Sequence, residues 1–242
     1  MLLYNIIQKR HPLIGLCVFF TFILSQGLSL LNFCLFSSYN NFTLCIKSDD
    51  YIYEIIKRFM DIVLSIIGLV IGIPIIAFFS ILIVLESPGS PIYIQERVGK
   101  YGKHFKIYKL RSMYKDAEKN GAKCADKEDP RITKIGAFIR KTRIDEIPQL
   151  LNVLKGEMSI VGPRPERPYF TYEFNEEIPG FINRLKVKPG LTGWAQVNGG
   201  YEMTPKEKLE ADLYYIENRS ILLDLKIIFK TIKVVLTGEG AR

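Results

Sequence analysis

Two long stretches of this sequence contain no charged residue, and they restrict the chain to folds that meet a membrane. The first runs from Leu13 to about Phe36, and the second runs from Ile62 to Leu85. At ~1.5 Å of rise per residue, a helix of either length crosses a hydrocarbon core of ~30 Å. We therefore expect a membrane protein with a polar domain attached to it.

The first apolar stretch predicts a transmembrane helix over about residues 13–36. Lys9 and Arg10 precede it, which favours a cytoplasmic N-terminus. A signal peptide is the alternative, but its apolar core is usually only ~7–15 residues long and a small-x-small cleavage site follows it. Residues 1–51 are therefore predicted to be this hydrophobic segment and a polar linker, and residues 52–242 a domain with a membrane helix at about 57–86.

The second apolar stretch has positive charge on both sides. Lys57 and Arg58 precede it and the basic residues 97–143 follow, so the positive-inside preference places both ends in the cytoplasm. Pro74 lies near its middle and predicts a kink, because proline removes a helix hydrogen bond. Two interpretations stay open: a kinked span, which hydropathy favours, and a re-entrant helix that turns back. If the first stretch spans outward, the second must span back; if the second re-enters, the first must start outside or not span.

Positive charge is concentrated in one part of the chain. The formal net charge is +8, yet residues 97–143 alone carry 15 Lys/Arg and 5 Asp/Glu. Such a stretch attracts the phosphates of a nucleotide, a lipid headgroup or a nucleic acid, although a solvated charged face is the simpler explanation. The four cysteines show no CxxC spacing, which argues against a disulfide framework or a zinc site and fits a reduced, cytoplasmic compartment.

Several elements of the polar domain can be predicted from local patterns. Residues 92–94 and 105–110 are β-like and are separated by glycines, which predicts a hairpin. Residues 114–130 resemble a surface helix followed by a loop. A capping box with proline starts a helix at residue 204. Residues 221–236 form an amphipathic, lysine-bearing helix that either lies on an anionic membrane surface or packs on the core.

Asp145 and Glu146 are the candidate catalytic pair. Residues 145–155 predict a short helix with Pro148 in its first turn, so the two carboxylates lie at its N-terminus. The helix dipole and the preceding basic residues favour the charged form of both. Ionised carboxylates act as nucleophiles or bind Mg²⁺, but helix capping explains most such pairs.

An arginine that follows shortly after the pair favours a catalytic role over helix capping. Arg164 stands between Pro163 and Pro165, in a rigid segment suited to bidentate phosphate recognition. A structural turn is the alternative for this segment.

In the identity and order of their motifs, residues from about 52 to 242 resemble the bacterial sugar transferase family, the monotopic polyprenyl-phosphate phosphoglycosyl transferases. The motifs that carry the resemblance are KRFMD at 57–61, QERVG at 95–99, FKIYKLRSM at 105–113, RIDEIPQLL at 143–151, NVLKG at 152–156, MSIVGPRP at 158–165, KPG at 188–190 and LTGWAQVNG at 191–199. Together they cover most of the domain, and no single one would be sufficient.

The resemblance implies a reaction and a set of roles. Family members transfer sugar-1-phosphate from a UDP-sugar to a polyprenyl phosphate, such as undecaprenyl phosphate, through a phosphosugar-aspartyl intermediate. Asp145 would be the nucleophile and Glu146 its partner, and both would bind Mg²⁺. The residues implied to bind substrate phosphates are Arg143, Arg164, Lys109 and Arg111, and the kink of the membrane helix is assigned to Pro74.

The resemblance also implies a fold and a location. We expect an α+β, mostly helical catalytic domain with a short β-hairpin, a re-entrant membrane helix and interfacial amphipathic helices. It would lie on the cytoplasmic face of the bacterial inner membrane and start the synthesis of an exopolysaccharide, a capsule or another surface glycan. Its partners would be the UDP-sugar, the polyprenyl phosphate and the bilayer, with no nucleic acid; a homodimer stays open.

Two positions depart from the family pattern. Many members have serine before the kink proline, where this chain has Ile73. A basic residue commonly follows the QVNG motif, where this chain has Gly200. The resemblance therefore does not extend to the residue before the kink proline or to the residue after the QVNG motif.

Two other functions remain as alternatives. A glycosyltransferase would move the sugar without its phosphate and release UDP instead of UMP. A membrane-anchored, non-catalytic phosphate- or lipid-binding scaffold would tolerate replacement of both carboxylates.

Overall fold

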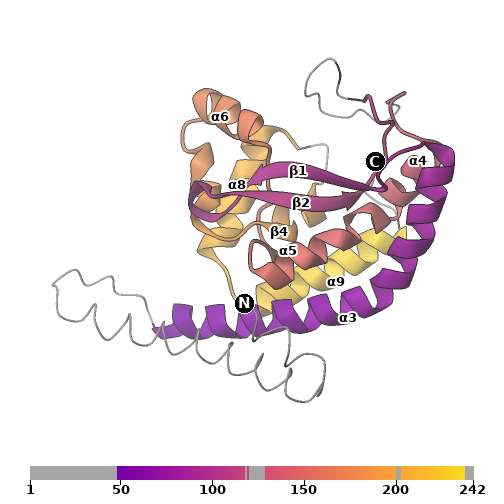
Figure 1. Ribbon diagram of the computed structural model, residues 1–242. Helices are drawn as coiled ribbons and strands as arrows, with labels where there is room; N and C mark the ends of the chain where they lie inside the picture. The colour runs from indigo at the N-terminus through magenta and orange to yellow at the C-terminus, as the bar shows by residue number, and fades with distance from the viewer. Residues whose placement is uncertain (1–47, 118, 120–128, 200–202, 238–242) are drawn as a thin grey trace, which may run out of the picture. The chain divides into compact units, whose positions relative to one another are not determined.

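The computed structural model describes residues 48–117, 119, 129–199 and 203–237, and these form an α+β fold rich in helices (Figure 1). The predicted transmembrane helix at 13–36 lies outside the described residues. The elements, with η for 3₁₀ helices, are α3 (Ser48–Glu86), β1 (Ile92–Val98), η1 (Lys100–Gly102), β2 (His104–Leu110), α4 (Lys134–Lys141), η2 (Ile144–Gln149), α5 (Leu150–Lys155), β3 (Ser159–Val161), α6 (Pro168–Glu177), η3 (Phe181–Lys186), β4 (Gly190–Thr192), α7 (Trp194–Asn198), α8 (Pro205–Glu217) and α9 (Ile221–Thr237).

Helix α3 has 39 residues and contains Pro74 in its interior. A straight helix of this length would extend roughly 58 Å, but α3 changes direction along its course (Figure 1). Both of its arms are attached to the same domain. In the first arm, Lys57 Nζ lies 2.8 Å from Asp224 of α9. In the second, the Glu86 carboxylate accepts hydrogen bonds from the first two backbone N–H groups of α4, at 2.7 and 2.9 Å.

The surface of α3 is largely apolar and uncovered. Within the described residues, Tyr51–Glu86 is the one helix long and apolar enough to cross a membrane, and only 17% of its most apolar window is buried. Its exposed side chains include those of Ile52, Ile55, Phe59, Ile66, Ile67, Val70, Ile71, Phe78, Ile81 and Leu85. The helix starts at Ser48, so residues 48–51 belong to it and not to the predicted linker.

The predicted hairpin is confirmed. Strands β1 and β2 pair antiparallel from Ile92 opposite Leu110 to Val98 opposite His104. The connection is a short 3₁₀ turn in which Tyr101 and Gly102 have positive φ angles of 57° and 76°. Of the predicted surface helix and loop at 114–130, the described part forms a turn at 115–117, and most of the rest lies outside the described residues.

The core joins the hairpin to both the apolar helix α3 and the helices behind it. One cluster packs β2 against the segment after the candidate dyad and contains Phe105, Ile107, Val153 and Met158. A second contains Ile83 of α3 together with Leu110 and Ile139. A third contains Val161, Tyr215 and Ile227. The second arm of α3 is therefore part of the hydrophobic core.

A second, parallel sheet of two short strands, β3 and β4, was not predicted. The chain segments at the ends of β3 and β4 approach each other closely because the residues at these ends are glycines. A Cβ at Gly190 would lie 2.1 Å from the backbone nitrogen of Gly162, and one at Gly193 would lie 2.2 Å from the Gly162 carbonyl oxygen. The close approach of these glycines fixes the position of Gly162, two residues before Arg164.

The two C-terminal helices form as predicted. Thr204 and Glu207 make the capping box of α8. For helix α9, the predicted packing on the core is confirmed, while its contact with a membrane surface stays a prediction. Ile227 is fully buried in the third core cluster, while the side chains of Leu222 and Phe229 are 79% and 69% exposed. One side of α9 therefore packs on the domain, and another presents uncovered apolar side chains.

Candidate active site

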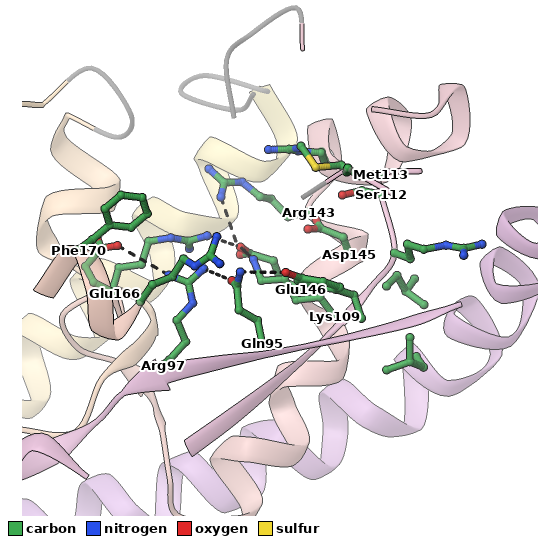
Figure 2. Close-up of a pocket in the computed structure, with 18 of the residues that line it drawn as sticks. Gln95, Arg97, Lys109, Ser112, Met113, Arg143, Asp145, Glu146, Glu166 and Phe170 are labelled. Atoms are coloured by element: carbon green, nitrogen blue, oxygen red, sulfur yellow. Dashed lines mark hydrogen bonds and ion pairs between the residues drawn. The ribbon is translucent and has the colours of Figure 1, made fainter. Parts of the chain in front are cut away.

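A cavity of about 610 Å³ lies beside the hairpin, and both predicted catalytic carboxylates line it (Figure 2). Ten of the described lining residues are cationic and four are acidic. The cations are Arg97, Lys109, Arg111, Lys115, Arg140, Arg143, Arg164, Arg167, Arg184 and Lys208, and the acids are Asp145, Glu146, Glu166 and Asp212. A cavity with this surplus of positive charge suits an anionic ligand.

The dyad lies at the start of a helical segment, as predicted, but the first turns are 3₁₀ and not α-helical. Arg143 precedes this segment with a φ of 60°, in the left-handed region that non-glycine residues rarely adopt. Asp145 and Glu146 are in the first turn of η2, which continues directly into α5. Gly156 ends α5 with a φ of 82°, as a left-handed cap.

Glu146 is surrounded by cations. Its Oε1 accepts from Lys109 Nζ at 3.0 Å and from Arg164 Nη2 at 2.6 Å, and its Oε2 lies 3.8 Å from Arg143 Nη1. Burial alone would raise the pKa of Glu146, but the charges of Arg164, Lys109 and Arg143 outweigh burial and hold its pKa well below the usual range. The structure thus brings three of the four predicted phosphate-binding residues onto one carboxylate.

Asp145 has a different environment, although it is the next residue. It is 7% exposed, and its carboxylate makes no hydrogen bond or ion pair within the described part of the chain. Burial raises the pKa of Asp145 to about 6; Lys109 opposes this rise, and the charge of Glu146 adds to it. The nearby cations therefore do not lower the pKa of Asp145 as expected, because desolvation exceeds their effect, although with a pKa of about 6 the charged form still dominates at neutral pH.

Arg111, the fourth predicted phosphate-binding residue, contacts the end of α3. Its Nη1 donates to the Pro88 carbonyl at 3.2 Å, and its Nη2 donates to the Ser87 carbonyl. Arg111 also lines the cavity, so its contact with a phosphate stays a prediction. Pro74 is in the interior of α3 and is not among the residues that line the cavity.

Two glycines of α3 allow it to approach the helix that carries the dyad. A Cβ at Gly68 would lie 2.7 Å from Leu150 Cδ1, and one at Gly72 would lie 2.5 Å from Ile147 Cγ2. Ile147 follows Glu146 directly in the chain. Helix α3 is therefore in direct contact with the segment that positions the dyad.

The other end of the cavity contains residues that the sequence did not single out. Figure 2 shows Arg97, Glu166 and Phe170 at this end of the cavity and Asp145 at the opposite end. Arg184 Nη2 lies 2.6 Å from Asp212 Oδ2, and both side chains are buried. Arg97 was part of a family motif, but neither Arg184 nor Asp212 lay in a motif or local pattern that would have identified it.

The dyad offers the ligand type that Mg²⁺ prefers. Within the described residues, no group of three or more His, Cys, Asp or Glu side chains could hold a metal by itself. Mg²⁺ is commonly bound by one or two carboxylates, with substrate phosphates and water completing its shell. The carboxylates of Asp145 and Glu146 fit a Mg²⁺ ion that binds together with a phosphate substrate.

Comparisons with known proteins identify similar chains in several bacteria. An Aeromonas hydrophila relative, named UDP-N-acetylgalactosamine-undecaprenyl-phosphate N-acetylgalactosaminephosphotransferase, is 49% identical over 194 residues, which are 79% of this chain and 46% of that protein. A Bacillus subtilis (strain 168) relative is 65% identical over 146 residues, 60% of this chain and 80% of the relative, and is provisionally named an undecaprenyl-phosphate N-acetylgalactosaminyl 1-phosphate transferase.

A third relative, the UDP-glucose:undecaprenyl-phosphate glucose-1-phosphate transferase of Escherichia coli (strain K12), is 41% identical over 184 residues, 74% of this chain and 40% of that protein. The chain thus spans less than half the length of the Aeromonas and Escherichia relatives. The model of the family described as bacterial sugar transferase matches residues 52–238. Because this match covers most of the chain, the protein belongs to the bacterial sugar transferase family.

Proposed function

We propose that the protein transfers sugar-1-phosphate from a UDP-sugar to a membrane polyprenyl phosphate, with Asp145 as the nucleophile. The observation that carries this proposal is the contrast within the dyad. The Glu146 carboxylate is held by three cations, whereas the Asp145 carboxylate lines the same cationic cavity without a partner in the described part of the chain. The names of the relatives, which specify undecaprenyl phosphate and sugar-1-phosphate transfer, support the same reaction.

In the first proposed step, an Asp145 carboxylate oxygen attacks the phosphorus atom that bears the sugar. A bond forms between this oxygen and phosphorus, the bond from phosphorus to the bridging oxygen breaks, and UMP leaves with that oxygen and its electron pair. The product is an acyl phosphate that links Asp145 to the sugar. Charge develops on the transferred group, where Lys109, Arg143 and Arg164 can stabilise it.

In the second step, an oxygen of the polyprenyl phosphate attacks the same phosphorus. The Asp145–phosphorus bond breaks, the carboxylate is regenerated, and a polyprenyl diphosphate sugar is released. Both steps are displacements at phosphorus that need positioning and charge neutralisation more than proton transfer. A covalent intermediate also lets a soluble donor and a lipid acceptor use one site in turn.

Mg²⁺ would be held by Asp145 and Glu146 together with the donor phosphates, and when bound it would neutralise the diphosphate charge. Side chains of the protein contribute to the reaction independently of the metal. Lys109 and Arg164 hold Glu146, at 3.0 and 2.6 Å, and so fix the geometry of the dyad. Burial of Asp145 weakens the hydration of its carboxylate before it reacts.

We also propose that α3 enters the inner membrane from the cytoplasmic side and turns back. Lys57 in one arm and Glu86 at the end of the other both contact the catalytic domain, so both ends of the helix lie on the side of that domain. The exposed apolar side chains of α3 and of α9 would then face lipid. This arrangement would hold the dyad near the surface where a lipid phosphate can reach it.

The donor that we propose to test first is UDP-N-acetylgalactosamine. The relatives from Aeromonas hydrophila and Bacillus subtilis, at 49% and 65% identity, both carry names with N-acetylgalactosamine. Transfer of this sugar phosphate to undecaprenyl phosphate would start assembly of a surface glycan such as an exopolysaccharide or a capsule.

The deciding experiment measures the nucleotide released by the purified protein with UDP-N-acetylgalactosamine, undecaprenyl phosphate and Mg²⁺. We expect UMP release, lost by about 10³-fold or more in Asp145→Asn, because the amide is not a nucleophile of comparable strength. Asp116→Asn is the matched control, since Asp116 is exposed and paired with Lys119. Release of UDP would identify a glycosyltransferase, and wild-type-like activity of Asp145→Asn would refute the assigned nucleophile.

A second measurement tests the intermediate. Incubation with the donor but without the lipid should leave a phosphosugar on the protein, visible by intact-protein mass spectrometry, and absent from Asp145→Asn. A scaffold without catalytic function would give neither UMP nor an adduct.

A further inference from the structure

The segment that carries Arg164 is held through its carbonyl groups. Its two prolines lack N–H groups, so carbonyls are the main backbone groups available for hydrogen bonds. Four consecutive carbonyl oxygens each accept one: Pro163 from Gly190 N at 2.8 Å, Arg164 from Arg184 Nη2 at 3.0 Å, Pro165 from Arg97 Nη1 at 3.1 Å, and Glu166 from Val98 N at 3.0 Å. Two of the four donors are side chains of arginines, and both arginines line the cavity.

Each nitrogen of the Arg184 guanidinium has a partner within the protein. Its Nε and Nη2 donate to Asp212 Oδ2 at 3.0 and 2.6 Å, and its Nη1 lies 3.8 Å from Glu166 Oε1. The side chains of Arg184 and Asp212 are 4% and 2% exposed. The guanidinium also lies 4.8 Å from the centre of the Phe181 ring. A residue that binds a substrate phosphate would instead keep N–H groups directed at the empty space of the cavity.

Burying an ion pair this deeply is costly, and replacement by apolar side chains is often neutral for stability. A geometric role therefore explains the pair better than stability does. The carbonyl that Arg184 holds belongs to Arg164, whose own Nη2 lies 2.6 Å from Glu146 Oε1. Asp212, Arg184, Arg164 and Glu146 thus form one continuous connection from α8 to the catalytic pair.

We propose that Arg184, held by Asp212, is a positioning residue for Arg164. Arg184 fixes the Arg164 backbone so that the guanidinium of Arg164 stays on Glu146. Arg184 itself does not contact the donor. The effect on turnover rests on the proposed function, whereas the effect on the Arg164 side chain does not.

The first test is a double-mutant cycle with Arg164→Gln and Arg184→Lys, measured by UMP release. A lysine supplies one point charge and cannot bond Asp212 and the Arg164 carbonyl in the same planar geometry. We expect Arg184→Lys to lower kcat by about tenfold with little change in the donor KM, and by less than about twofold when Arg164 is already glutamine. Fully multiplicative effects, or a loss confined to KM, would mean that Arg184 contacts the donor independently.

Lys186→Gln is the matched control. It removes a positive charge from the same 3₁₀ segment, but Lys186 is exposed and does not line the cavity. We expect its kcat and KM to equal those of the wild type. An equal loss in Lys186→Gln would show that the general charge of this segment, and not the bonding of Arg184, determines the rate.

A paired variant separates positioning from folding. Arg184→Met with Asp212→Leu replaces both charges by apolar side chains of similar size, so we expect a melting temperature close to that of the wild type. Turnover should stay as low as in Arg184→Lys, because nothing holds the Arg164 carbonyl. Full activity of the folded paired variant would overturn the proposal.

The last readout does not need turnover. The guanidinium ¹⁵N resonances of Arg164, assigned with Arg164→Lys, should be sharp in the wild type and exchange-broadened in Arg184→Lys. If the wild type releases no UMP from any donor, the proposed function fails and this measurement still decides the positioning role. Unchanged Arg164 resonances in Arg184→Lys would refute it.

Discussion

The two adjacent carboxylates of the dyad have opposite electrostatic environments, and this difference supports the roles proposed for them. Cations surround Glu146 and lower its pKa well below the usual range, so it stays ionised and fixed. Burial raises the pKa of Asp145 to about 6, so this carboxylate is more basic than an ordinary aspartate while still largely ionised at neutral pH. A more basic carboxylate is a better nucleophile towards phosphorus, which suits Asp145 for the attack.

The pH dependence of kcat/KM tests this assignment. Asp145 attacks as a carboxylate, so the rate should rise with pH through its pKa and level off above it, with the acidic limb near pH 6. Lys109 is the leading cation that lowers the pKa of Asp145, so Lys109→Met should move this limb to higher pH. The measurement is the initial rate of UMP release between about pH 5 and 9, a range that includes the raised pKa of about 6.

Lys106→Met is the control for this experiment, because Lys106 is an exposed lysine in the same strand, β2. Its acidic limb should coincide with that of the wild type. If the limb of Lys109→Met stays in place or moves to lower pH, Lys109 does not control the protonation of Asp145.

At the level of elements, the contact between α3 and the dyad segment links the long apolar helix to the candidate active site. Gly72 leaves space for the Ile147 side chain, since a Cβ at residue 72 would lie 2.5 Å from Ile147 Cγ2. The same relation holds between Gly68 and Leu150, one turn earlier, at 2.7 Å. Two glycines four residues apart thus form a notch in α3 that receives two consecutive contacts of η2 and α5.

Filling this notch should displace the dyad. We expect Gly72→Val to lower the free energy of unfolding by about 1–3 kcal/mol, because overpacking forces the neighbouring backbone to shift. The rate of UMP release should also fall, since Ile147 adjoins Glu146. Ala77→Val is the control, because it adds bulk to an exposed position of the same helix. Both variants are compared by thermal unfolding in detergent and by UMP release.

A second substitution distinguishes a direct clash from a general effect on α3. Ile147→Ala removes the atom that a residue 72 side chain would meet, so it should restore part of the stability lost in Gly72→Val. Equal destabilisation by Ala77→Val, or no recovery with Ile147→Ala, would contradict the notch as the cause.

Local patterns predicted those elements whose cause is local. The hairpin, the Thr204 capping box and the end of the short helix at residue 155 depend on residues close in sequence, and the structure confirms them. The raised pKa of Asp145 and the pair formed by Arg184 with Asp212 depend on contacts between distant segments. No periodicity or spacing contains that information, so the sequence alone did not find them.

Family resemblance reached further into the site than local patterns did. It named Lys109, Arg143 and Arg164, and the structure brings all three to Glu146. It also named Arg111, whose outer nitrogens instead donate to carbonyls at the end of α3. A motif identifies which residues matter together, but the partner of each one is decided by the fold.

At the level of the whole molecule, the domain and the apolar helix α3 are attached to each other at two distant points of α3. Near its start, Tyr53 and Lys57 both donate to Asp224 Oδ2, at 3.0 and 2.8 Å. At its end, Glu86 caps α4, and Arg111 donates to the carbonyls of the next two residues. A single domain cannot contact both ends of a straight helix that crosses a bilayer, so the two attachments favour an α3 that returns to the side it entered from.

This topology can be measured with single cysteines at positions 50 and 90, in a chain whose four native cysteines are replaced by serine. Tyr101→Cys marks the side of the catalytic domain, because Tyr101 is exposed in the hairpin turn. We expect all three positions to resist a membrane-impermeant maleimide in intact cells and to react once the inner membrane is permeabilised. Labelling of position 50 in intact cells, with positions 90 and 101 protected, would show that α3 spans the bilayer. The attachments of Lys57 and Glu86 to one domain would then have to be broken in the membrane, because that domain cannot lie on both sides at once.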